Sequence, residues 1–273
     1  MSGTLQSQKL RSLINEAEGQ VHAEENRWFP RHFPNPVVIA MAGLSGTGKT
    51  TLVKYLETGT ALDDMSKQMY DKTLGLIPRT FAGTTRAVLP GDGKFSVIDA
   101  GGDGEGHYAL EERICHQNPH GIIFMVDNFN IPEHQDRWTR LCHFLLNKRR
   151  AAKRLCSVLV LANKMDEWPN GLLSLREQLG YLVGEGGPYM TPQTHPLVPM
   201  TEEQRMVLFW IESAMKGGKS ILESFPGIKV DVQLYPCSFV APRNSVRGLD
   251  VDVAIRRFLV AILRQHGWLG GRL

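Results

Sequence analysis

A glycine-rich stretch between residues 43 and 50 carries residue types that bind phosphate. It reads Gly43-Leu-Ser-Gly-Thr-Gly48-Lys49-Thr50, which fits the spacing G-x-x-x-x-G-K-[ST]. Glycines let such a loop curl until successive backbone N–H groups point at one phosphate, and the helix that follows adds the positive end of its dipole. The lysine would contact the β and γ phosphates, and the threonine hydroxyl would ligate Mg²⁺. The predicted phosphate site comprises Gly43, Ser45, Gly46, Thr47, Gly48, Lys49, Thr50 and Thr51.

A second short motif follows a later apolar run. Asp99-Ala-Gly-Gly102 comes directly after the expected strand 95–98, so its carboxylate would lie at the strand's C-terminal end, beside the glycine-rich loop. There Asp99 can hold Mg²⁺ and the Gly102 N–H can contact the γ-phosphate. Asp-x-x-Gly is common on its own, and its position in the chain is what gives it meaning.

A third motif supplies side chains suited to a purine base. Asn163-Lys164-Met-Asp166 ends the apolar run 157–161. The Asp166 carboxylate can accept hydrogen bonds from the N1–H and exocyclic amine of guanine, a donor pair that adenine lacks. Asn163 could bond the base or brace the glycine-rich loop, and the Lys164 stem could lie over the ring. The spacing therefore predicts selectivity for guanine over adenine.

Together these motifs resemble those of the translation-factor-related GTPases, and among them the Ras/Arf-like small GTPases. The runs Leu159 to Asp166 and Asp99 to Gly102 look most like the Arf and signal-recognition-particle-receptor β branch. The resemblance implies GTP/GDP and Mg²⁺ as ligands. It also implies that a backbone N–H at Ser238-Phe239, after the last expected strand, meets the guanine O6.

The same resemblance implies a threonine in the first switch loop that reaches Mg²⁺ and the γ-phosphate only in the GTP state. Thr80, Thr84 and Thr85 are the candidates. If a strand at 86–89 turns at 91–93 and pairs with 95–98, the residue opposite Asp99 is about residue 85. The family's threonine lies a few residues earlier, which favours Thr80. The Ala82-Gly-Thr-Thr-Arg86 stretch looks instead like the switch of Era and tRNA-modification GTPases, which favours Thr84 or Thr85.

Two positions depart from the family pattern. Many relatives place a water-orienting glutamine directly after the Asp-x-x-Gly motif, and Asp103 stands there. An ionised aspartate cannot donate and is repelled by the γ-phosphate, which argues against fast intrinsic hydrolysis. His107 could take the place of the glutamine if the second switch loop, residues 102–115, folds back. Otherwise His107 is expected to be a solvated loop residue. Ser45 replaces the usual glycine and can impede a partner's arginine finger.

The elements that must position these motifs alternate along the chain. Apolar runs at 36–42, 95–99, 121–127, 157–162 and 230–235 are typical of buried parallel strands, and most precede helical stretches such as 51–56 and 249–265. This order predicts a three-layer α/β P-loop NTPase fold: a mostly parallel sheet, one antiparallel edge strand and helices on both faces.

Composition and length bound the rest of the prediction. The chain has 273 residues and a formal net charge of +3, too small to drive nucleic-acid or membrane binding by itself. Four cysteines without metal-like spacing and no apolar run long enough to span a bilayer favour a cytoplasmic protein without a direct membrane anchor, although a partner could bring it to a membrane. We expect an N-terminal helical extension at 1–36 and a GTPase domain at 37–273.

An insertion at about 168–229 separates the base motif from the last strand. Its apolar helix, expected at 202–216, could pack on its own domain or form a partner surface. Protein effectors or regulators are expected at the switch loops, residues 76–87 and 102–115. The sequence thus predicts a GTP/GDP switch with slow or partner-assisted hydrolysis. The alternatives are a GTP-binding scaffold with little turnover and a small-molecule kinase that shares only the phosphate loop.

Overall fold

The computed structural model describes nine stretches of the chain: residues 37–58, 76–82, 94–100, 104–148, 152–165, 168, 202–224, 230–239 and 246–267. The N-terminal extension predicted at 1–36 lies outside them, as do Gly102, Asp103 and Asp166.

Six strands form one sheet in the order β2-β3-β1-β4-β5-β6. All neighbours are parallel except the edge pair, in which β2 runs antiparallel to β3. The strands are β1 Val37–Gly43, β2 Leu76–Ala82, β3 Lys94–Ala100, β4 Gly121–Val126, β5 Ser157–Ala162 and β6 Asp231–Pro236. The sequence order reverses around β1, since the chain adds β3 on one side of it and β4 on the other. Open α/β sheets bind their ligands at such a reversal, beyond the carboxyl ends of the strands.

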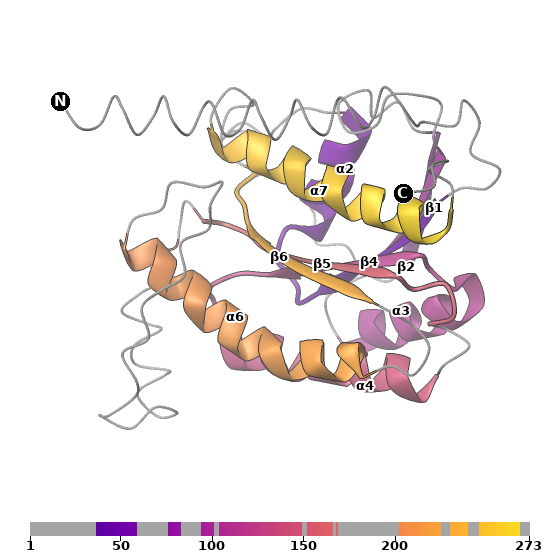
Figure 1. Cartoon of the computed structure of the whole chain (residues 1–273), viewed down its shortest axis with the longest axis horizontal. Helices are drawn as coiled ribbons and strands as arrows, with labels where there is room; N and C mark the ends of the chain where they lie inside the picture. Colours follow the sequence, from indigo (N-terminus) through magenta and orange to yellow (C-terminus); the bar gives the residue numbers. More distant parts are fainter. Residues whose placement is uncertain are drawn as a thin grey trace.

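Helices cover both faces of the sheet (Figure 1). One face carries α2 and α7, and the other carries α3, α4 and α6. Their bounds are α2 Lys49–Thr58, α3 Gly104–Gln117, α4 Ile131–Asn147, α6 Glu202–Glu223 and α7 Val246–Gln265. The three-layer P-loop NTPase fold predicted from the sequence is therefore confirmed.

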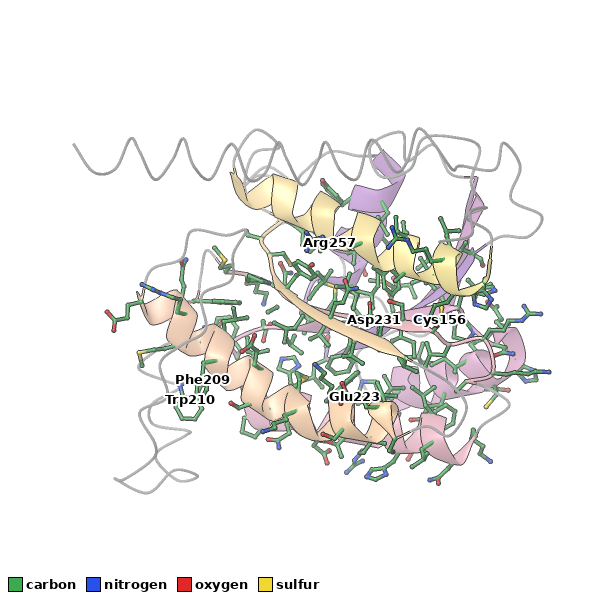
Figure 2. All side chains as sticks on the ribbon, viewed as in Figure 1. Cys156, Phe209, Trp210, Glu223, Asp231 and Arg257 are labelled. Atoms are coloured by element: carbon green, nitrogen blue, oxygen red, sulfur yellow. The ribbon has the colours of Figure 1, made fainter. Side chains whose placement is uncertain are left out.

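The central strands are apolar throughout because each faces a helix layer on both sides. In β4, Ile122, Phe124 and Val126 pack toward α3, α4 and α6. The alternate residues Ile123 and Met125 pack toward α2 and α7. Side chains fill the space between the sheet and both helix layers (Figure 2), so the core fixes the strand ends at which the motifs lie.

The predicted edge hairpin has the wrong register. The partner of β3 is Leu76–Ala82, which pairs Ile77 with Asp99 and Phe81 with Phe95; it is not the expected strand at 86–89. The sequence prediction placed the turn at the glycines of 91–93. The observed register instead places Ile77 opposite Asp99, eight positions before the expected residue 85. Pro78 is compatible with β2 because a proline, which lacks an N–H, is tolerated in an edge strand.

The helix of the predicted insertion packs on its own domain. Helix α6 lies along α4 (Figure 1), and the Trp138 indole N–H of α4 donates to the Met215 carbonyl of α6 at 2.8 Å. A Cβ on Gly218 would stand 2.2 Å from Trp138 Nε1, so the two helices touch closely there. Phe209 and Trp210 are only half-buried, with ring centroids 5.7 Å apart (Figure 2).

None of the helices in the described stretches is long and apolar enough to cross a lipid bilayer. All four cysteines are free thiols, and Cys115 is the exposed one.

A buried histidine links the start of β4 to β1 and makes stability depend on pH. Burial, with His266 and Arg154 nearby, lowers the pKa of His120 from 6.5 to about 4. Its Nδ1 accepts a hydrogen bond from the Val38 amide at 3.0 Å. Because the folded-state pKa lies below the unfolded one, this contribution is complete above pH ~6.5 and is lost as pH falls toward 4. Between pH 7 and pH 5 the loss should be about 2 kcal/mol of unfolding free energy.

Urea unfolding at pH 7 and pH 5 measures this loss in the wild type and in His120→Asn. The asparagine keeps an acceptor for the Val38 amide but does not titrate, so it should be less sensitive to acid than the wild type. His116→Asn, at an exposed position of α3, is the control. Equal acid sensitivity of wild type and His120→Asn would contradict the prediction.

Candidate nucleotide-binding site

The polar motifs meet at one edge of the sheet because parallel strands end on the same side. The glycine-rich loop leaves β1, Asp99 lies at the end of β3, and Asp127 directly follows β4. Asn163 and Cys237 directly follow β5 and β6. Backbone bonds tie these ends together: the Asn163 amide donates to Val126 O at 2.8 Å and the Cys237 amide to Ala162 O at 2.7 Å.

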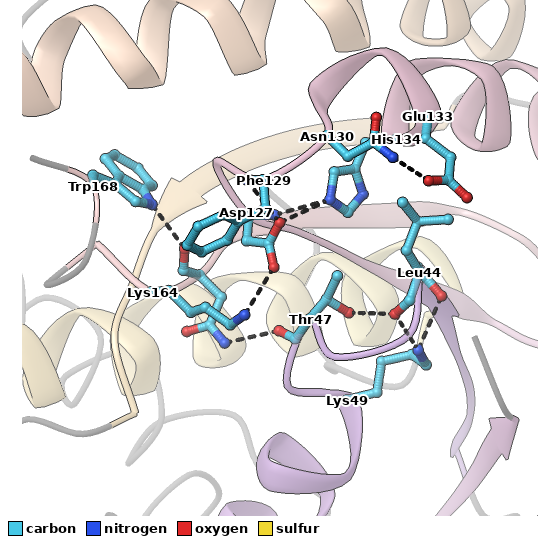
Figure 3. A network of polar contacts seen from close by, with 12 residues as sticks. Leu44, Thr47, Lys49, Asp127, Phe129, Asn130, Glu133, His134, Lys164 and Trp168 are labelled. Carbon is cyan, nitrogen blue, oxygen red and sulfur yellow. Dashed lines mark hydrogen bonds and ion pairs between the residues drawn. The ribbon is translucent and has the colours of Figure 1, made fainter. Parts of the chain in front are cut away.

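The glycine-rich loop is curled and internally hydrogen-bonded. Lys49 Nζ donates to the carbonyls of Gly43 and Leu44 at 2.9 and 2.7 Å, and Thr47 Oγ1 donates to Leu44 O at 2.9 Å (Figure 3). Lys49 and Thr47 are buried. The lysine ammonium is therefore held by the first two residues of the loop that precedes it.

Glycine is required at Gly48 by both conformation and space. Its φ is +96°, a region that side chains rarely adopt, and an added Cβ would stand 2.4 Å from Asn163 Nδ2. Asn163 comes this close because its side-chain amide donates to Thr47 O at 2.8 Å (Figure 3). The sequence left two roles open for Asn163, and in the structure it braces the glycine-rich loop. This bond joins the phosphate motif to the base motif.

The turn that carries Asn163 to Met165 is held from several sides. The Met165 amide donates to Cys237 O at 3.1 Å, and the Trp168 indole N–H donates to Asn163 O at 2.8 Å. Gln204, in the first turn of α6, donates to Met165 O at 3.1 Å. Asp166, the predicted base reader, lies between these described residues but is not itself described.

Lys164 has an unusual backbone and a fixed side chain. Its φ is +59°, uncommon for a residue with a side chain. Its ammonium lies 3.0 Å from Asp127 Oδ2 and 5.1 Å from the centroid of the Phe129 ring. Phe129 is one of two large apolar side chains that are exposed in the described stretches, the other being Tyr108.

Both residues of the segment predicted to contact the base after β6 are buried. Ser238 is buried, and the Phe239 ring packs against Tyr55 of α2 at 5.8 Å between centroids. The Phe239 side chain is turned into the core, and the contact of this segment's backbone with a base stays a prediction.

Asp99 and Thr80, two of the predicted metal ligands, are not neighbours along the edge hairpin. Asp99 is fully buried and pairs with Ile77, whereas Thr80 pairs with Ser96 in the middle of β2. Three residue steps separate Thr80 from Ile77, about 10 Å along a strand. The register that favoured Thr80 is therefore wrong. The expected first switch loop at 76–87 is also wrong in part, because 76–82 is a strand.

The predicted second switch begins as helix α3 at Gly104. His107 lies in the first turn of this helix and is half-buried, so it is not the exposed loop histidine that the sequence suggested. Gly102 and Asp103 lie outside the described stretches. In the described stretches no three His, Cys, Asp or Glu side chains gather as a metal cluster. A magnesium ion bound by one carboxylate, one hydroxyl and phosphates would not need such a cluster.

The sequence did not predict four residues that lie beside the motifs. Trp168 and Gln204 donate to the carbonyls of Asn163 and Met165. Asp127 contacts Lys164, and His134 contacts Asp127. For Asp127 a signal existed, since it follows an apolar strand run as Asp99 does. For the other three no spacing rule connects them to residues 163–165.

No known protein-family model matches the chain. Among solved structures, the fold is similar to the Arl6 (BBS3) small GTPase of Trypanosoma brucei with a bound nucleotide analogue, at 14% identity and a TM-score of 0.47 over 86% of this chain and all of that one. It is also similar to the Sar1 small COPII coat GTPase of Encephalitozoon cuniculi in complex with GDP, at 18% identity and a TM-score of 0.45 over 97% and 93%. A bacterial selenocysteine-specific elongation factor is similar at 16% identity and a TM-score of 0.43, over 83% of this chain and 29% of that one.

Proposed function

We propose that the chain is a GTP/GDP-binding switch of the Ras/Arf-like kind, with slow or partner-assisted hydrolysis. The observation that carries the proposal is the hydrogen bond from Asn163 to Thr47 O. It joins the glycine-rich loop, which carries Lys49, to the turn that begins at Asn163, although the two are more than a hundred residues apart in sequence. A small-molecule kinase has no need for the second motif there.

Phosphate binding falls to the glycine-rich loop. The N–H groups around Gly46 to Thr51 would surround the β-phosphate at the N-terminus of α2, and Lys49 would reach the β and γ phosphates. Gly46 is exposed and has open space around it, consistent with a loop that leaves room for an anion. Gly102 would contact the γ-phosphate, as the sequence predicts.

Base binding falls to Asp166, Lys164 and the backbone of Ser238-Phe239. The residue that precedes Asp166, Met165, is held by hydrogen bonds to Cys237 after β6 and to Gln204 of α6, which supports a base contact at this point of the chain. A buried site that pairs with both guanine donors rejects adenine strongly, because adenine would leave the carboxylate unpaired.

Magnesium fits the oxygen donors at this edge of the sheet. Asp99 is a fully buried carboxylate, and Thr50 adds a hydroxyl at the start of α2; both are hard donors that Mg²⁺ prefers. When bound, the ion would neutralise charge that develops on the phosphates. The family's switch threonine lies a few residues before the partner of Asp99, and the observed partner is Ile77. We therefore assign that role to Thr73 rather than Thr80.

Hydrolysis would proceed by attack of water on the γ-phosphorus and release of GDP with the bridging oxygen. Lys49 would stabilise charge on the leaving oxygen. Asp103 stands where relatives orient water with glutamine, and it is poorly suited to that role. We keep His107, in the first turn of α3, as the candidate for that role. The presence of Asp103 and Ser45 keeps a GTP-binding scaffold with little turnover as the second candidate function.

Partners would read the nucleotide state through the switch segments before β2 and around the start of α3. We propose a cytoplasmic protein, related to the Arf and signal-recognition-particle-receptor β branch, whose effectors bind there.

Competition binding tests the proposal directly. With a fluorescent GDP probe on the full chain, GTP and GDP should displace the probe at concentrations at least about 10³-fold lower than ATP. Nucleotide extracted from the protein after incubation with GTP should remain mostly GTP if turnover is slow. Equal displacement by ATP would defeat the base assignment, and rapid conversion to GDP without a partner would defeat slow hydrolysis.

A further inference from the structure

Two buried side chains that belong to none of the sequence motifs, Asp127 and His134, adjoin Lys164 of the base motif. Asp127, directly after β4, and His134 of α4 are both buried, at 4% and 1% exposure. His134 Nε2 lies 3.0 Å from Asp127 Oδ1. Lys164 Nζ lies 3.0 Å from Asp127 Oδ2 (Figure 3). The carboxylate thus uses one oxygen for the histidine and the other for the lysine.

The protonation of this network follows from its geometry. His134 Nε2 has two contacts with Asp127: the carboxylate Oδ1 at 3.0 Å, which can only accept, and the backbone amide at 3.4 Å, which can only donate. We assign the proton to Nε2 because the contact with the carboxylate is the shorter of the two. The Phe129 amide donates to the same Asp127 oxygen at 3.1 Å. Burial raises the pKa of Asp127, but the His134 hydrogen bond and the Lys164 charge outweigh burial and hold that pKa below its usual value. Asp127 is therefore an ionised carboxylate whose Oδ1 is held by His134 and the Phe129 amide, while its Oδ2 contacts the lysine.

Fixing the carboxylate also fixes Lys164. A lysine side chain normally samples many rotamers and loses that freedom only when its ammonium is held. Here the ammonium lies between Asp127 and the Phe129 ring, on a backbone with positive φ. Such a backbone persists only where its surroundings over-determine it. The lysine is thus held in place by groups of the protein itself.

We propose that His134 is a positioning residue for nucleotide binding, which acts through Asp127 to hold the Lys164 stem where the base lies. The inference rests on the proposed function. His134 itself does not touch the nucleotide; its role is to remove the freedom that Lys164 would otherwise lose on binding. The effect should be confined to the base end of the ligand, because the Lys49 loop makes its own hydrogen bonds.

The alternative is that His134 only packs α4 against the sheet. A packing defect would disturb the whole edge of the sheet, including the phosphate loop. A positioning role predicts weaker binding of nucleotides but unchanged binding of inorganic tripolyphosphate, which carries no base. The two roles therefore differ in a measurable way.

Three variants of the full chain separate them. His134→Leu fills the volume but removes the donor. His134→Gln keeps an N–H donor near the position of Nε2. His143→Leu makes the same change at an exposed position of the same helix. In stopped-flow measurements, labelled GDP should dissociate about tenfold faster from His134→Leu, while His134→Gln restores most of the wild-type rate and His143→Leu matches the wild type. The concentration of tripolyphosphate that displaces the labelled GDP measures whether the phosphate-binding loop is intact in each variant.

A double-mutant cycle gives the decisive result. In a Lys164→Met background, His134→Leu should change GDP dissociation no further, because its effect passes through the lysine. The proposal would be overturned if His134→Leu still accelerated GDP dissociation fully in the Lys164→Met background, or if it reduced tripolyphosphate affinity as much as GDP affinity.

If His134→Leu does not fold, Asp127→Asn takes its place in the cycle, because it keeps the shape of the carboxylate without its charge. Additive effects of Asp127→Asn and Lys164→Met on GDP dissociation would then overturn the proposal. A wild type that binds no guanine nucleotide defeats the proposed function instead, so the two failures are distinct.

Discussion

Replacing Lys49 with methionine is expected to weaken guanine-nucleotide binding by roughly 10²- to 10⁴-fold while the chain stays folded. The ammonium would make charge-assisted hydrogen bonds to two phosphates, each worth about 1.5 to 3 kcal/mol. In the structure Nζ lies within 2.9 Å of two loop carbonyls, so the loop itself holds the ammonium in place. Methionine keeps most of the buried stem and removes only the charged end.

Equilibrium titration with labelled GDP measures the effect, and a thermal melt checks that the variant is folded. Lys153→Met removes a lysine at an exposed position away from the predicted motifs and should bind as the wild type does. Unchanged GDP affinity in a folded Lys49→Met protein would mean that the glycine-rich loop is a mere connection between β1 and α2.

The sequence predicted the layers of the fold well because burial dictates composition. Strands β1, β4 and β5 lie inside the sheet with helices on both faces, and only continuous apolar runs are stable there. The glycine-rich loop followed for a similar reason: a strand, the motif and a helix coincide over residues 37–58. Both features are set by residues that are close together in the sequence, so one sequence is enough to predict them.

The edge hairpin could not be predicted in the same way. Strand β2 has one sheet neighbour and contains Pro78, so its sequence lacks the apolar run that marks inner strands. The glycines at 91 and 93 offered a competing turn, and an antiparallel pair admits several registers unless a buried face selects one. An error of this kind moved the predicted partner of Asp99 by eight residues, from 85 to 77, and the choice of switch threonine with it.

The supports of the base motif were hidden for a different reason. His134 reaches Lys164 through Asp127, and Gln204 reaches Met165 from α6, across 30 and 39 positions of sequence. Such contacts arise only after helices pack on the sheet. The local sequence does not predict these contacts, because a single histidine or glutamine on a helix looks the same whether it packs in the core or contacts a binding site.

Substituting Asp166 with asparagine is expected to shift the preferred base from guanine to xanthine. The aspartate carboxylate accepts from the N1–H and the exocyclic amine of guanine. An asparagine amide presents one acceptor and one donor, so its donor would face the guanine amine, but it matches the carbonyl that xanthine has in that place. Loss of GTP affinity of about 10³-fold or more would follow, because a site built for polar partners penalises a mismatch strongly.

The described surroundings of Asp166 make this exchange a clean test. Met165 is hydrogen-bonded to Cys237 and Gln204, and the Trp168 indole donates to Asn163 O, so the turn should keep its shape when one side-chain oxygen becomes an amide. Asp136→Asn, the same change at an exposed position of α4, is the control. Competition by GTP, XTP and ATP against labelled GDP or labelled XDP gives the order of affinities. Because the phosphate loop is unaltered, Asp166→Asn should still bind XTP tightly. An Asp166→Asn protein that retains full preference for GTP would show that the base is read by some other group.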